Sequence, residues 1–125
     1  MNKFLVVLNA INGILFIAIG LLWVISPYEA GANFGILEIS EGLGRSSLIG
    51  DVGSYFFCIG LMMILAAYTL RNIWFYAPAM LLGVTALFRV ISWAAHDATF
   101  ATQFIIIEIL LIALLLVTSK RMSSQ

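Results

Sequence analysis

The sequence predicts an all-α protein, an antiparallel four-helix transmembrane bundle with both termini in the cytoplasm. Three observations lead to this prediction. Of the 125 residues, 63% are hydrophobic and only 10% are charged, a balance that excludes an ordinary soluble domain. The apolar residues fall into four runs that are long enough to cross a bilayer as helices. The basic residues lie mainly on one side of those runs.

The first apolar run follows Lys3 and is interrupted by Asn9 and Asn12, which suit hydrogen bonding between helices. Its apolar core is longer than that of a signal peptide, so we expect a retained helix. Glycines in the first two runs, among them Gly50 and Gly53, should let neighbouring helices approach closely. The whole chain, 1–125, is predicted to form a single domain. Its expected spans are 4–25, 46–70, 73–95 and 101–118.

A loop at 26–44 separates the first two spans. Ser26-Pro27 should end the first helix, and the following stretch is rich in glycine and acidic residues. We expect one short interfacial turn near Leu37 to Glu41. A loop of this length in a small protein often covers a site.

The basic residues predict the orientation. Lys3, Arg71, Lys120 and Arg121 fall on one side of the expected bundle, whereas Arg45 stands alone among acidic residues on the other side. Because basic residues concentrate in cytoplasmic segments, both termini are predicted to be cytoplasmic, with the loop outside. We therefore expect an integral membrane protein with both termini on the cytoplasmic side.

The third and fourth spans each carry one charged residue inside an apolar run. A charge at such a position costs roughly 2.5–3.5 kcal/mol, so it points to a site or to a partner. If the turn between these spans is centred between Ala98 and Thr99, Arg89 and Glu108 lie equally far from it. Their depth would be roughly 10–14 Å below the turn at the helical rise. We expect them to pair, because an unpaired charge in hydrocarbon is far more costly.

Other polar residues are expected near this pair. Ser92 and His96 fall on the same helical stripe as Arg89, and Asp51 lies about two turns inside the second span. The expected cluster comprises Asp51, Arg89, Ser92, His96 and Glu108, with Arg45 and Asp97 at its rim. Two interpretations stay open: an ion pair that locks two helices together, or a site for a ligand, an ion or a proton. A cavity that reaches a free donor of Arg89 would favour the second.

Several chemistries receive little support from the motifs. Metal ligation would draw on His96, Asp97, Asp51 and Glu108, but the spacings typical of metal-binding helices are missing. Nucleophilic catalysis would need Ser92 or Ser54 with His96 as base, without any oxyanion motif. A proton relay across the membrane is not expected, because the titratable groups gather in one half. We predict no catalytic residue, metal or cofactor.

Two segments resemble a known group. GRSSLIGDVGSYFFCIGLMMILA and LFRVISWAAHD are similar to a family of small bacterial four-span membrane proteins of unknown function, loosely related to the DoxX-like group. The resemblance implies a glycine-rich second helix, here with Gly50 and Gly53, and an Arg-x-x-Ser motif followed by an acidic residue, here Arg89, Ser92 and Asp97. Ala98 stands where the resemblance implies glycine. The resemblance supports the predicted fold and the membrane location.

The function expected from these patterns is that of a small, non-enzymatic integral membrane protein. It would be an accessory subunit of a membrane complex or would bind a hydrophobic, lipid-like ligand. The alternative is a small-molecule carrier or membrane enzyme that uses an outward-facing polar pocket around Arg89. Its partners would be the lipid bilayer and a larger complex or further copies of the chain. The zero net charge gives no case for nucleic acid.

The orientation is testable by labelling. A cysteine placed at Glu38, in the acidic loop, should react with membrane-impermeant thiol reagents added from the outside only. Labelling of Glu38→Cys from the cytoplasmic side would overturn the predicted topology.

Overall fold

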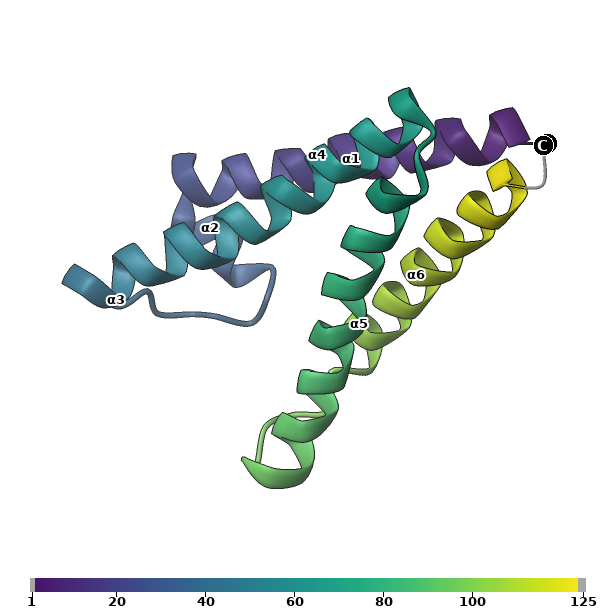
Figure 1. The fold of residues 1–125 in the computed structure, drawn as a ribbon. Coiled ribbons are helices and arrows are strands. Elements are labelled where there is room, and N and C mark those ends of the chain that lie inside the picture. The colour runs from purple at the N-terminus through teal and green to yellow at the C-terminus, as the bar shows by residue number, and fades with distance from the viewer. Residues whose placement is uncertain (1, 124–125) are drawn as a thin grey trace.

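The computed structural model describes residues 2–123, and this part of the chain is helical without strands (Figure 1). The helical type changes within the second long helix, where a π-helical segment separates two α-helical ones. In order, the elements are α1 (Asn2–Ile25), α2 (Pro27–Ala32), α3 (Gly42–Ser47), η1 (Leu48–Gly53), α4 (Ser54–Thr69), α5 (Asn72–Ala95) and α6 (Thr102–Ser123).

Four of the helical stretches are long and apolar enough to cross a membrane, which confirms the predicted four-helix class. The second stretch combines α3, η1 and α4 into one helix over Gly42–Thr69, and so begins before the predicted residue 46. The last helix continues to Ser123, past the predicted end at 118. Lys120 and Arg121 occupy its last turn, where positive charge interacts favourably with the helix dipole.

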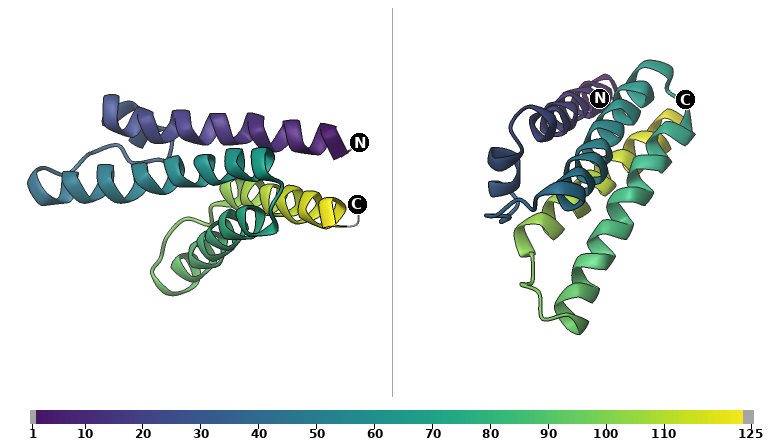
Figure 2. Two further views of the ribbon diagram at one scale, coloured as in Figure 1. Left: turned by 45° about the horizontal axis from the view of Figure 1, so that its top comes forward. Right: turned by 90° about the vertical axis from the view of Figure 1, so that its left-hand side faces the viewer.

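The long helices form two antiparallel pairs. α1 packs along α4, and α5 packs along α6. The two pairs converge at the end that holds both termini and the α4–α5 turn, and they diverge toward the opposite end (Figures 1 and 2). The bundle is therefore open at the end that carries α2, α3 and the α5–α6 turn.

Glycines let α1 and α4 approach closely. Gly13 of α1 faces Gly60 of α4, and further along the same two long helices Gly20 faces Gly53. An added Cβ at Gly60 would lie 2.6 Å from the backbone nitrogen of Ile17, so no larger residue fits without a shift. Gly50, which was also expected to allow close approach, has no neighbour within 4 Å of such a Cβ.

Two side-chain hydrogen bonds join helices at the closed end, one between the two pairs and one within the α5–α6 pair. The Asn9 amide nitrogen donates to the Thr118 hydroxyl at 2.9 Å, and Asn9 is fully buried. The Ser119 hydroxyl donates to the Asn72 side-chain oxygen, also at 2.9 Å. Asn12 instead donates to the Leu8 carbonyl of its own helix. One of the two asparagines thus makes the expected contact between helices.

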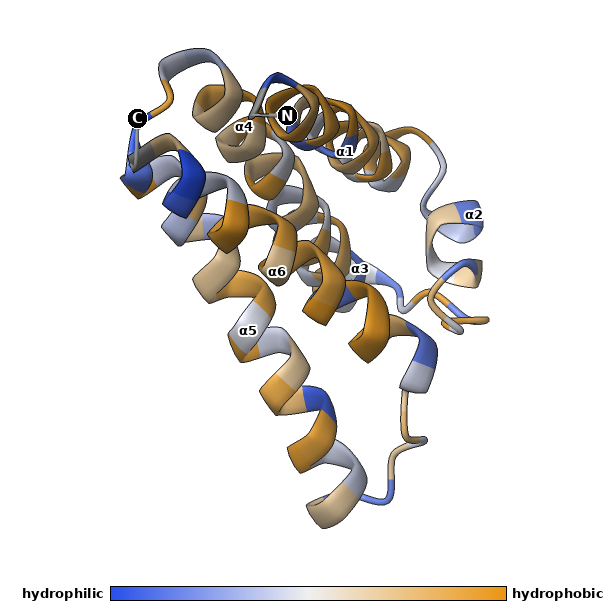
Figure 3. Ribbon diagram, turned by 90° about the vertical axis from the view of Figure 1, so that its right-hand side faces the viewer, coloured by the Kyte–Doolittle hydropathy of each residue, from blue (hydrophilic) through white to orange (hydrophobic). Residues whose placement is uncertain are grey.

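The outward faces of the long helices are apolar (Figure 3). A soluble monomer rarely exposes contiguous apolar surface over most of its faces. In a bilayer, the same side chains lie against lipid. Large exposed examples come from all four spans: Phe4, Ile11, Ile14, Val24, Leu61, Met80, Leu87, Phe88, Ile106, Ile109 and Leu110.

The acidic loop folds onto the open end of the bundle. The short interfacial turn expected at Leu37 to Glu41 is wrong, because these residues are not helical. The helical turn is α2, which starts at Pro27, a residue whose fixed φ suits the first helical position. Ile39 is buried, and a Cβ on Gly31 would meet its side chain at 2.9 Å. This packing holds the loop in place.

The close approach of α1 and α4 can be tested by adding one methyl group. We expect Gly60→Ala to lower the free energy of unfolding by roughly 1–3 kcal/mol, the usual cost of overpacking. Gly50→Ala is the matched control, because its Cβ meets no neighbour and alanine favours helix. Thermal unfolding in detergent, followed by circular dichroism, measures both. Equal midpoints for the two variants would contradict the packing.

Candidate functional site

The π-helical segment η1 supplies part of one wall of the site. π-Turns inside α-helices are rare and occur often at functional positions. This segment contains Asp51 and Val52, and the next turn of the helix contains Tyr55 and Phe56. All four residues line the same cavity. The widened turn therefore lies where the second span faces the space between the helix pairs.

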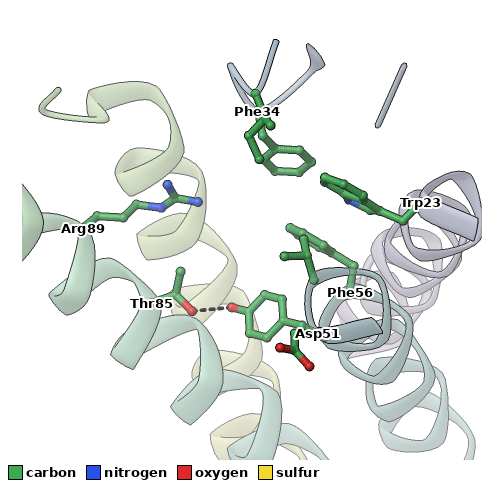
Figure 4. Close-up of a pocket in the computed structure, with 9 residues that line it drawn as sticks. Trp23, Phe34, Asp51, Phe56, Thr85 and Arg89 are labelled. Atoms are coloured by element: carbon green, nitrogen blue, oxygen red, sulfur yellow. Dashed lines mark hydrogen bonds between the residues drawn. The ribbon is translucent and has the colours of Figure 1, made fainter. Parts of the chain in front are cut away.

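That space is a cleft of about 420 Å³, here called the central cleft (Figure 4). Both helix pairs and the acidic loop contribute to it, and its surface is mainly aromatic and apolar. The lining residues are Trp23, Phe34, Ile36, Asp51, Val52, Tyr55, Phe56, Thr85 and Arg89.

An ion pair joins α5 to α6 beside the cleft. The Nε of Arg89 donates to both carboxylate oxygens of Glu108, at 3.2 and 3.1 Å. The side chains are 27% and 10% exposed, so the pair is largely removed from the surface of the chain. The Arg89 guanidinium also lies over the Phe104 ring, with its central carbon 4.9 Å from the ring centre. The structure thus brings together the two charges that the helical register placed at equal depth.

The pairing leaves most of the guanidinium free. Arginine has five N–H donors, and only the one on Nε contributes to this pair. Among residues 2–123, neither terminal nitrogen of Arg89 has a hydrogen-bond acceptor. The side chain extends from α5 into the central cleft (Figure 4). Unused donors at the wall of a cavity meet the condition that favours a ligand site.

Two further cavities reach Arg89. The first is an apolar chamber of about 180 Å³, lined by Leu15, Phe16, Ile19, Phe34, Phe56, Leu82, Arg89, Phe104, Ile107, Glu108 and Leu111. A 150 Å³ apolar cavity in another protein accommodates benzene, so the chamber can hold a ring or a short stretch of chain. The second is an open polar mouth, lined by Phe34, Gly35, Arg89, Thr99, Phe100, Ala101, Thr102, Gln103 and Phe104. Arg89 therefore lies where an apolar and a polar space meet.

Phe34 of the acidic loop lies between the two helix pairs. Its ring stacks on Phe104 of α6, with centres 5.4 Å apart and planes at 17°. On the other side it contacts Phe56 of α4 at 5.0 Å and Trp23 of α1 at 6.3 Å. Because Phe34 borders all three cavities, its position controls how they connect.

Trp23 leaves a polar atom unpaired next to the cleft. It is fully buried, and its indole extends from α1 toward the centre of the cleft (Figure 4). Its Nε1 finds no acceptor within the described part of the chain. A buried N–H without a partner is uncommon and costly, which makes an acceptor from outside the chain a reasonable occupant.

A hydrogen bond closes the opposite wall of the cleft. The Tyr55 hydroxyl of α4 bonds to the Thr85 hydroxyl of α5, and Thr85 also donates to the Leu81 carbonyl at 2.8 Å. This contact ties the two pairs together at mid-height. Asp51 lies beyond it, exposed, with its carboxylate directed away from the guanidinium (Figure 4).

The remaining predicted residues lie at the rim. The Ser92 carbonyl accepts hydrogen bonds from the backbone of His96 at 2.9 Å and of Ala98 at 3.2 Å, which ends α5. Asp97 adopts a left-handed φ of 58°, a conformation that aspartate tolerates better than most residues. Ser92, His96 and Asp97 line none of the three cavities.

Arg45 is also outside these cavities. It donates to the Tyr28 hydroxyl at 2.9 Å and to the Ser40 carbonyl at 3.1 Å. Its guanidinium also lies over the Tyr28 ring. These contacts hold α2 and the loop against α3.

The geometry bears on the other chemistries considered. Over residues 2–123, no three His, Cys, Asp or Glu side chains gather as a metal site would require. Within the same range, the Ser92 hydroxyl and the His96 imidazole share no hydrogen bond.

The aromatic residues of the site carried little signal in the sequence. Tyr55 was placed on one face with Asp51, and the two do share the cleft. Phe34 stands in an acidic, glycine-rich loop, and nothing in its neighbourhood predicts that it enters the bundle. Phe104 and Trp23 read as ordinary apolar positions of a membrane helix.

Comparison with known proteins adds no relative. No family model, curated protein or solved structure matches the chain. The resemblance to the DoxX-like group stays a prediction.

The ion pair can be tested by removing its cation. We expect Arg89→Ala to lower the free energy of unfolding by about 1–3 kcal/mol, because it leaves a buried carboxylate without a partner. Arg45→Ala is the control, since that side chain makes exposed contacts, and its cost should stay below about 1 kcal/mol. Melting temperatures in detergent compare the two. Equal losses would contradict an ion pair inside the membrane.

Proposed function

We propose that this small membrane protein binds a hydrophobic or lipid-like ligand in the central cleft, with Arg89 as the polar anchor. One observation carries the proposal: Arg89 borders three cavities, and its terminal nitrogens make no hydrogen bond within residues 2–123. The Arg89 side chain is 27% exposed, and each terminal nitrogen carries N–H groups that can only donate. A ligand that offers an acceptor oxygen would satisfy these donors.

The mode of pairing favours binding over scaffolding. An arginine that only locks two helices is best satisfied by two parallel hydrogen bonds from its fork to a carboxylate. Here one nitrogen serves both oxygens of Glu108, and the outer edge of the fork faces open space. The unpaired Nε1 of Trp23 adds a second donor beside the same cleft.

The shape of the site supports an amphipathic ligand. The apolar chamber and the polar mouth share Arg89, Phe34 and Phe104. An apolar body in the chamber would place its polar group at the guanidinium. Ligand sites in proteins typically combine an apolar lining with a few placed polar groups. We propose binding rather than catalysis, because the reactive candidates Ser92 and His96 lie outside the cavities.

We also propose a location in the bacterial inner membrane with both termini in the cytoplasm. The distribution of charge supports it. Arg71, Lys120 and Arg121 belong to the end of the bundle where both termini and the α4–α5 turn lie (Figures 1 and 2). Basic residues favour the cytoplasmic side. The cleft would then open toward the outer face.

The resemblance to the DoxX-like group is part of the same proposal. Two of its motif positions have structural roles here, since Arg89 borders the cleft and Gly53 lies in the α1–α4 contact.

Native mass spectrometry of protein gently extracted from its own membrane tests the ligand. We expect the chain to carry a defined small mass, which Arg89→Gln should lose because the anchoring donors are gone. Arg45→Gln is the matched control and should retain that mass, since Arg45 lies outside the three cavities. A large co-purifying complex without any Arg89-dependent small mass would instead favour an accessory subunit.

A further inference from the structure

The charged residues that line the cavities limit what the ligand can be. Across the central cleft, the chamber and the mouth, the charged lining residues are Arg89, Glu108 and Asp51. The single cation is already paired with a carboxylate at 3.1 Å. Asp51 also lines the central cleft, but its carboxylate is exposed and directed away from the guanidinium (Figure 4). The site thus offers hydrogen-bond donors without a net positive charge.

An anion would be a poor occupant of such a site. Its charge would enter a largely apolar space in which Glu108 already compensates Arg89. A buried charge without its own counter-ion is strongly disfavoured. An uncharged acceptor, such as an ester or ketone oxygen, can use the free donors without adding charge.

We propose that the ligand is an uncharged apolar molecule whose anchoring group is a neutral acceptor oxygen, such as a carbonyl, and not an anionic head group. This inference rests on the proposed function and specifies its ligand class. The acceptor oxygen meets the terminal nitrogens of Arg89, and the apolar body fills the chamber beside Phe104. Glu108 therefore selects against anions while it keeps the arginine in place.

A matched pair of brominated probes separates the two charge classes. Dibromostearic acid and its methyl ester differ in the charge of one end, and bromine quenches tryptophan fluorescence on contact. A Trp74→Phe, Trp93→Phe background leaves Trp23, which borders the central cleft, as the reporter. Both probes are titrated in the same detergent at a pH where the acid is ionised. The part of the quenching that Arg89→Gln abolishes measures binding at the site.

The expected result is a preference for the ester. It should saturate the Arg89-dependent quenching at roughly a tenfold lower mole fraction than the acid, because only the acid brings in an uncompensated charge. Glu108→Gln should reverse this preference, since it leaves the arginine without its counter-ion. If Glu108→Gln fails to fold, dibromostearamide gives a second measurement on the native chain, because it matches the acid in size but carries no charge. The amide should bind at the Arg89-dependent site as the ester does, and binding as weak as that of the acid would contradict selection by charge.

The outcomes separate the two levels of the proposal. Arg89-dependent quenching in which the acid binds as tightly as the ester would overturn the neutral ligand and leave the binding function standing. Quenching by both probes that ignores Arg89 would remove the binding function and the inference together. A dibrominated diacylglycerol then identifies the source of the neutral oxygen. If the diacylglycerol binds as tightly as the single-chain ester, the ligand is assigned as a bilayer lipid. If the diacylglycerol does not bind, the ligand is assigned as a free single-chain molecule.

Discussion

An arginine inside an apolar helix must be neutralised, and much of this protein's functional architecture follows from that constraint. Arg89 meets it through Glu108 on the neighbouring helix, which fixes the register of α5 against α6. The solution is incomplete, because a single nitrogen makes the contact and the rest of the fork faces cavities. The charge of Arg89 is therefore balanced by Glu108, but its terminal N–H groups have no acceptor among residues 2–123. These unused donors are the basis of the proposed ligand site.

The space beside Arg89 exists because the two helix pairs have different kinds of contact. Within α1 and α4, glycines bring the backbones together and leave no room for anything else. Between the pairs, the hydrogen bond from Asn9 to Thr118 joins α1 to α6 at the closed end. Further from that end, the contact of Tyr55 with Thr85 and the ring of Phe34 join the two pairs. A bundle fastened at one end opens at the other.

At the open end of the bundle, Phe34 contacts both helix pairs. Its ring contacts aromatic side chains from both pairs, and it belongs to a loop that is packed rather than loose. Apolar rings can slide or turn at little cost compared with breaking buried hydrogen bonds. Phe34 also lines all three cavities that Arg89 borders, so the loop forms part of the candidate site.

The sequence by itself determined the properties that depend on helical period, length and charge. Four apolar runs predicted the four membrane-spanning helices, and equal spacing from one turn predicted the contact of Arg89 with Glu108. The apolar runs are local features, and the Arg89–Glu108 contact links two helices joined by one turn. Counting residues along the chain is therefore enough to predict both. The tertiary structure alone decided that the pairs diverge, that Phe34 enters the bundle, and that Ser92 and His96 stay outside the cavities. These outcomes depend on packing between segments that are distant in the sequence, and such packing leaves no periodic pattern along the chain.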